Sequence, residues 1–74
     1  MTPETEDERQ LVLLRMPVGI AGSGYARYAA AMYFNRRGRM SQELLEIYRI
    51  CCKHDVEDPR AVAIHEGISP DLLP

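Results

Sequence analysis

The sequence predicts an all-α fold, a small domain of three or four helices centred on a helical hairpin over residues 24–54. Two stretches of this region carry apolar residues at helical spacing. A short basic turn, Arg36-Arg37-Gly38-Arg39, separates them. Most of the large apolar residues lie on these stretches or just before them, so the hairpin is expected to hold the core.

Length and charge point to one domain with an acidic start. Residues 1–8 hold four acids and no base, and we expect them to form an acidic, partly disordered N-terminus. Residues 9–74 are then a single helical domain. A chain of 74 residues buries a modest fraction of its surface, so its stability alone is marginal.

A helix from about Glu6 to Arg15 is predicted before the hairpin, because Thr5 and Glu8 have capping-box spacing ahead of an apolar run. The alternative is a strand over residues 11–16, since short apolar runs are ambiguous. Leu, Arg, Gln, Glu and Met favour the helix.

The first hairpin helix is expected to begin after Ser23, an N-cap residue type, and to end before Gly38. At 100° per residue, one broad apolar face is predicted, and it consists of Tyr25, Tyr28, Ala29, Met32 and Tyr33. Ala30 and Phe34 fall on the opposite side, beside Arg27. A helix that is apolar on two sides requires two neighbours.

The second hairpin helix is expected to begin after Ser41, its N-cap. Its apolar arc consists of Leu44, Leu45, Ile47, Tyr48, Cys51 and Cys52. Ile50 lies off this arc. The residues predicted to meet in the core are Leu44, Tyr48 and Cys51 from this helix and Tyr25, Ala29 and Met32 from the first.

Two further start signals follow. Asp58 before a proline predicts a helix over residues 59–66, with Gly67 as its stop. Ser69-Pro70 repeats the signal for a last short turn.

The composition indicates a cytoplasmic protein that does not span a membrane. No apolar stretch approaches membrane-spanning length, and the N-terminus is acidic where a secretory signal is basic. Cys51 and Cys52 are adjacent, so they cannot bridge to each other within a helix, and unpaired thiols fit a reducing compartment.

No motif in the chain identifies a reaction, and we expect neither an enzyme nor a bound cofactor. Gly19, Gly22 and Gly24 precede a helix, but their spacing differs from the dinucleotide fingerprint and no phosphate-loop lysine follows. Glycine there also suits a simple hinge.

A small metal or thiol sensor is one alternative function. The ligand types for it are present in Cys51, His54, Asp55 and His65. They lack the paired spacing of a zinc site, and small cysteines suit a core equally well. We therefore expect no bound metal.

A nucleic-acid-binding regulator is the other alternative, with the basic turn of Arg36, Arg37 and Arg39 as its contact. Glu43 and Glu46 oppose it, because they would meet phosphates with the wrong sign. The net charge of −2 also disfavours nucleic acid.

The favoured interpretation is a small protein–protein interaction module or accessory subunit, binding a protein partner or a second copy of itself. Phe34 lies off the main apolar faces, and Arg36, Arg37 and Arg39 follow it at the hairpin tip. An apolar centre with an arginine rim is the composition of many protein contacts. We expect these four residues to bind the partner.

Overall fold

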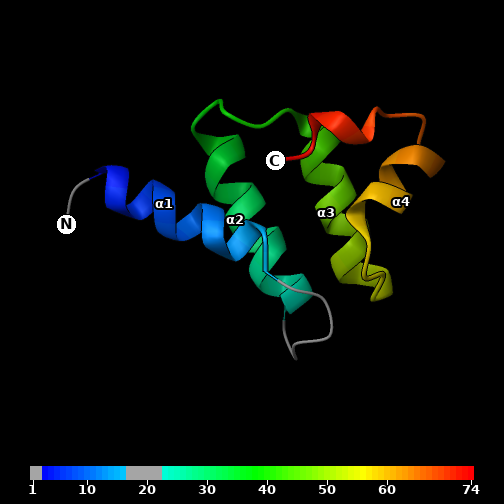
Figure 1. Ribbon diagram of the computed structural model, residues 1–74, viewed down its shortest axis with the longest axis horizontal. Coiled ribbons are helices and arrows are strands. Elements are labelled where there is room, and N and C mark those ends of the chain that lie inside the picture. Colours follow the sequence, from blue (N-terminus) through cyan, green and yellow to red (C-terminus); the bar gives the residue numbers. More distant parts are fainter. Residues whose placement is uncertain (1–2, 17–22) are drawn as a thin grey trace.

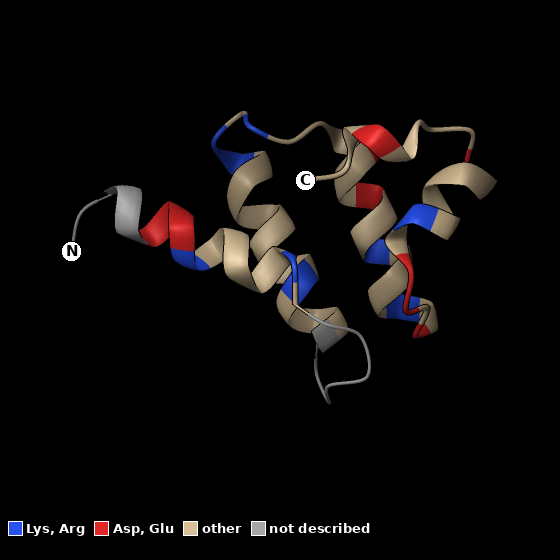
Figure 2. Ribbon diagram, in the orientation of Figure 1, with Lys and Arg blue, Asp and Glu red and all other residues tan. Residues whose placement is uncertain are grey.

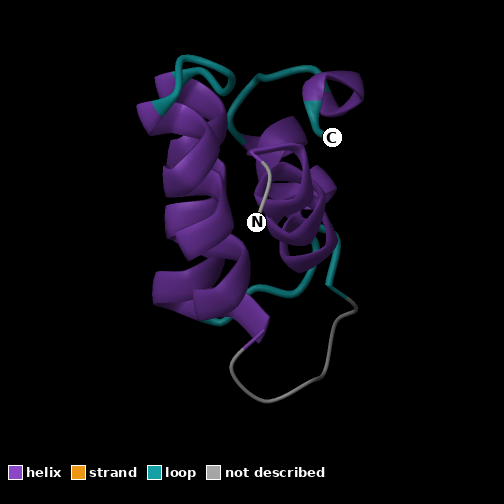
Figure 3. Ribbon diagram, turned by 90° about the vertical axis from the view of Figure 1, so that its left-hand side faces the viewer, coloured by secondary structure: helices purple, strands orange, loops and turns teal. Residues whose placement is uncertain are grey.

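The computed structural model describes residues 3–16 and 23–74 of the chain. These residues form helices joined by loops and contain no strand, which confirms the predicted all-α fold (Figures 1 and 3). The elements are α1 (Pro3–Leu14), α2 (Ser23–Arg36), α3 (Gln42–His54), α4 (Pro59–His65) and a short 3₁₀ turn, η1 (Pro70–Leu72). The predicted hinge glycines Gly19 and Gly22 lie outside the described residues.

The first helix differs from its prediction at its start. It begins at Pro3 instead of Glu6 and continues to Leu14, so the strand alternative over residues 11–16 is wrong. Proline suits the first position of a helix, and the acids that follow suit its positive end. Thr5 is therefore inside the helix instead of capping it. The predicted disorder within residues 1–8 stays a prediction.

The predicted caps Gly38, Ser41 and Asp58 are confirmed, whereas Ser23 is the first residue of α2 instead of preceding it. Gly38 closes the first hairpin helix with a φ of 71°. The Ser41 hydroxyl oxygen accepts from the backbone N–H of Leu44 at 3.2 Å, and an Asp58 oxygen accepts from that of Arg60 at 3.0 Å. Each cap satisfies a backbone group that the helix cannot pair internally.

The helices form a row in chain order (Figure 1): α1 packs on α2, α2 on α3, and α3 on α4. The molecule measures 38 × 27 × 18 Å. Viewed from the side, α2 and α3 lie in one layer, and α1 and α4 lie in a second layer beside it (Figure 3). The two middle helices are covered on two sides, whereas α1 and α4 each have an uncovered outer face.

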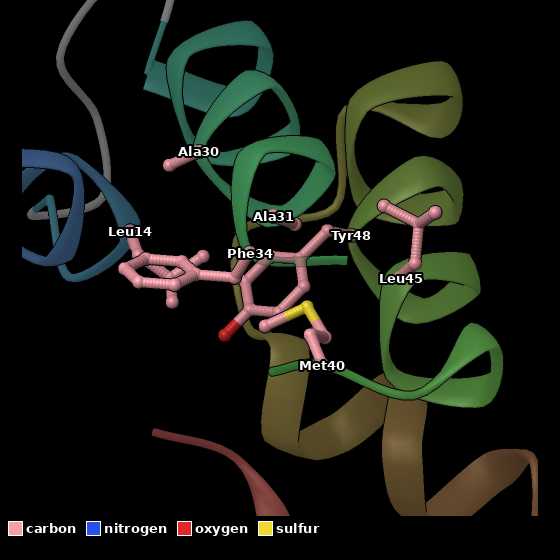
Figure 4. Packing of buried hydrophobic residues seen from close by; sticks show 7 residues of the cluster. All are labelled: Leu14, Ala30, Ala31, Phe34, Met40, Leu45 and Tyr48. Atoms are coloured by element: carbon pink, nitrogen blue, oxygen red, sulfur yellow. The ribbon is translucent and has the colours of Figure 1, made fainter. Parts of the chain in front are cut away.

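Two clusters of buried residues hold the row together. The first lies between α1, α2 and α3 (Figure 4) and consists of Leu14, Ala30, Ala31, Phe34, Met40, Leu45 and Tyr48. The second lies between α3 and α4 and consists of Ile47, Cys51, Val62 and Ala63. Leu44 and Leu73 pack against both clusters and join them.

The predicted buried face of α2 is wrong in part. Tyr25 is 68% exposed, whereas the buried residues of this helix are Arg27, Ala30, Ala31 and Phe34. They follow one another at i, i+3, i+4 and i+7, the spacing of a helix stripe that faces a core. The sequence does not reveal this stripe as a buried face, because its first residue, Arg27, is charged.

The predicted contact face of α3 is closer to the structure. Tyr48 and Cys51 are buried as expected, while Leu44 is half-buried. Of their expected partners on α2, Ala29 and Met32 are half-buried rather than central. Ala30 and Ala31 have no exposed surface, so the backbone of α2 comes near its neighbours at these two positions.

Candidate functional site

The four residues predicted to bind a partner do not form one surface. Arg36, Arg37 and Arg39 are exposed at the hairpin turn. Phe34 is only 7% exposed, and its ring points toward Leu14 of α1 inside the first cluster (Figure 4). The interpretation of Phe34 as an uncovered contact residue is therefore wrong, because α1 covers the side of α2 on which it lies.

The basic turn is engaged by the chain's own acidic helix. The guanidinium of Arg39 forms an ion pair with Asp7 of α1, and the Tyr33 hydroxyl donates to the same carboxylate at 2.5 Å. Figure 2 shows the acidic part of α1 and the basic turn beyond α2. Arg37 lies over the ring of Tyr33, 3.7 Å from its centre, and donates to the Tyr33 carbonyl.

These contacts shift the pKa values of the Asp7 carboxyl and the Tyr33 phenol. The hydrogen bond from Tyr33 lowers the pKa of Asp7 below its usual value of 3.8, and Arg39 adds to this effect while desolvation opposes it. The same bond raises the pKa of Tyr33 above its usual 10.0, because the neutral phenol is the donor. At neutral pH the Asp7 carboxylate thus joins α1 to Tyr33 of α2 and to Arg39 of the basic turn.

An apolar groove lies between α3 and α4, on the side of the molecule away from α1. It has a volume of about 440 Å³. Its lining residues are Ile50, His54, Val56, Ala61, Val62, His65 and Glu66. Positions four apart on each helix, Ile50 with His54 and Ala61 with His65, form its two walls, because such residues share a helix face.

Further apolar surface borders this groove. Ile64 is 65% exposed on α4, three residues after Ala61 and therefore on the neighbouring strip of that helix. The cause is the position of α4 at the end of the row: only Val62 and Ala63 face inward and are buried against α3. The groove and Ile64 together form the α4 surface referred to below.

The sequence contained one signal for this surface. Ile50 lies off the apolar arc of α3, and the structure places it half-buried against the second cluster, at the wall of the groove. An apolar residue off the main face of a helix indicates a second neighbour. The sequence predicts a contact site at Phe34, an apolar residue that also lies off the main helix faces. The structure instead leaves apolar surface exposed at α4.

The predicted metal-ligand types do not converge. Cys51 is buried, while His54, Asp55 and His65 are exposed. Among residues 3–16 and 23–74, no three His, Cys, Asp or Glu side chains are close enough to hold a metal ion. Burial raises the pKa of the Cys51 thiol, although the positive charge of Arg27 acts in the opposite direction.

Comparison with protein-family models, with curated proteins and with solved structures found no match to this chain. In the described part of the chain, no helix is long and apolar enough to cross a membrane.

Proposed function

We propose that this chain is a small protein–protein interaction module that binds an apolar helix of a partner protein in the groove between α3 and α4. The observation that carries the proposal is the open groove of about 440 Å³, which is lined mainly by apolar side chains and bordered by the exposed Ile64. Exposed apolar patches with polar edges are typical of contact sites.

The shape and edges of the groove favour a helix as the occupant. Two helices form its walls, so a third helix can place side chains spaced three and four residues apart between them. His54, His65 and Glu66 supply polar groups at its edge. Binding there would cover the outer side of α4, which the chain's own fold leaves exposed.

The basic turn is a weaker candidate for the contact. Arg39 is paired with Asp7, and Arg37 is stacked on Tyr33, so both would have to give up internal contacts to bind phosphate or protein. A nucleic-acid regulator would need these arginines for counterion release. This loss of available charge favours the groove over the turn.

The test compares two exposed apolar residues of similar size. Ile64→Asp alters the α4 surface, and Val12→Asp alters the outer face of α1, where the side chain is 70% exposed. A photo-crosslinker at position 61 is expected to trap a discrete partner. Binding of that purified partner should weaken tenfold or more in Ile64→Asp and remain unchanged in Val12→Asp, since an unpaired carboxylate placed in an apolar contact costs at least about 1.4 kcal/mol, a factor of ten.

Sedimentation at several concentrations identifies the remaining occupant, a second copy of this chain. Dimers that Ile64→Asp abolishes and Val12→Asp leaves intact would assign the groove to self-association. A chain that stays monomeric and traps no partner from position 61 would contradict the proposal.

A further inference from the structure

Arg27 is a buried cation without a counter-ion among the described residues. It is only 6% exposed. Both terminal nitrogens reach the same acceptor, the backbone oxygen of Glu57, at 3.4 Å, and Nε has no hydrogen-bond partner. Hydrogen bonds of this kind are usually about 2.9 Å long, so this carbonyl compensates the charge poorly. A buried charge costs several kcal/mol unless it is paired, so its environment requires an explanation.

A second cavity lies beside Arg27, separate from the α3–α4 groove. It has a volume of about 290 Å³ and lies where the end of α1, the side of α2, Tyr48 of α3 and the start of α4 meet. Arg15 and Arg60 line it together with Arg27. No residue of this cavity belongs to the groove.

The charge of this cavity is strongly positive. Its lining side chains include three arginines and one acid, Asp58, which gives a net side-chain charge of +2. The Asp58 carboxylate already accepts from the backbone at the start of α4, and Arg60 makes only a 3.9 Å ion pair with the exposed Asp71. Like charges around one cavity repel one another, and a bound anion relieves that repulsion.

The positive charges of this cavity also affect the pKa of Tyr48. Burial is the main cause that raises the pKa of Tyr48, but the charges of Arg27 and Arg15 both act to lower it. Both guanidinium groups are therefore close enough to Tyr48, which lines the cavity, to affect its pKa.

We propose that this cavity binds the phosphate group of a small phosphate monoester, with Arg27, Arg15 and Arg60 as its ligands. Guanidinium groups pair with phosphate through parallel N–H bonds, and burial of Arg27 strengthens that pairing. A monoester carries nearly two negative charges at neutral pH, which matches the net charge of the cavity, whereas one carboxylate would neutralise half of it.

The size of the cavity limits the ligand. A volume of about 290 Å³ equals that of roughly ten water molecules, since each takes about 30 Å³ of liquid. This admits a phosphate with a short organic group. Glycerol phosphate is therefore a suitable probe.

The test follows the Arg27 Nε–H signal by two-dimensional NMR while glycerol phosphate is added at constant ionic strength. The signal should shift and saturate. Arg15→Gln and Arg60→Gln change exposed residues at the cavity and should each weaken binding about tenfold, as expected for the loss of a charge-assisted hydrogen bond. Arg36→Gln, at the opposite end of α2, is the matched control and should leave affinity unchanged.

Two further arms complete the test. Arg27→Lys keeps the charge but loses the planar fork, so it should fold and bind more weakly. Succinate has the same charge without a phosphate and should bind at least tenfold more weakly than glycerol phosphate. An Arg27 signal that does not saturate, equal weakening by Arg36→Gln, or succinate binding as tightly as glycerol phosphate would each overturn the proposal.

Discussion

Arginines of this chain have different roles that depend on their contacts. Arg39 forms an ion pair with Asp7, and Arg49 forms one with Glu46 on the surface of α3. Arg27 is buried beside a cavity and has no ion-pair partner among the described residues. The number of arginines can be read from the sequence, but the role of each one cannot. Contacts between distant segments decide it, as between Asp7 and Arg39.

Asp7→Asn is expected to lower the melting temperature at neutral pH, because it removes the charge that Tyr33 and Arg39 share. The pKa of Asp7 is depressed in the folded state, so its contribution is complete above the unfolded value of 3.8 and is lost as pH falls through the lower folded value. The melting temperatures of the variant and the unaltered protein should therefore converge in acid, as followed by circular dichroism.

Glu8→Gln is the control for Asp7→Asn, since it removes an exposed acid from the neighbouring position. If both variants melt alike at neutral pH, the Asp7 contact does not hold α1 to the turn.

Phe34→Ala tests whether this ring is a core residue or a contact residue. Truncation of a buried phenylalanine costs about 3–5 kcal/mol, close to the whole stability of a small domain. We expect a chain that is largely unfolded or melts far lower, measured by urea denaturation. Tyr25→Ala removes an exposed aromatic ring of the same helix and should change stability by about 0.5 kcal/mol or less. Equal losses of stability in the two variants would contradict the burial of Phe34.

At the scale of the elements, the starts and stops of the later helices were predictable because they depend on local chemistry. Ser41, Asp58 and Gly38 act on backbone groups only a few residues away. The positions of α1 and α3 decide which face of α2 is buried. The sequence of α2 does not favour one face, because alanines and tyrosines occur all around the helix. Arg27 was missed for that reason, although its spacing to Ala30 and Phe34 is that of a buried stripe.

Gly38→Ala measures how much the hairpin turn depends on glycine. Gly38 has a φ of 71°, and a Cβ built there meets no atom within 4 Å. The cost is then conformational, about 1–2 kcal/mol for an L-residue in the left-handed region. Gly38→Asn should cost less, because asparagine adopts this region more readily. Denaturant midpoints of the two variants provide the measurement, and equal losses would indicate a steric cause instead.

At the scale of the whole molecule, a row of helices leaves few residues fully enclosed. Ile47 is the largest side chain with less than 2% exposure among the described residues. Two clusters joined through Leu44 and Leu73 hold the row, so cooperativity between its two ends depends on these bridging contacts. If residues 9–74 form one domain, as predicted, α4 and the hairpin must unfold together.

The two cysteines allow that coupling to be measured. Cys51 is 3% exposed in the cluster between α3 and α4, whereas its neighbour Cys52 is half-buried. If the chain unfolds as one unit with a stability of about 5 kcal/mol, labelling of Cys51 should be slowed several-thousand-fold relative to the unfolded chain, since each 1.36 kcal/mol is roughly a factor of ten. Cys52→Ala and Cys51→Ala variants, each with a single thiol, give the two rates, and Cys52 should react much faster. Labelling of Cys51 as fast as Cys52 would mean that α4 opens independently of the hairpin, and residues 9–74 would not be one cooperative domain.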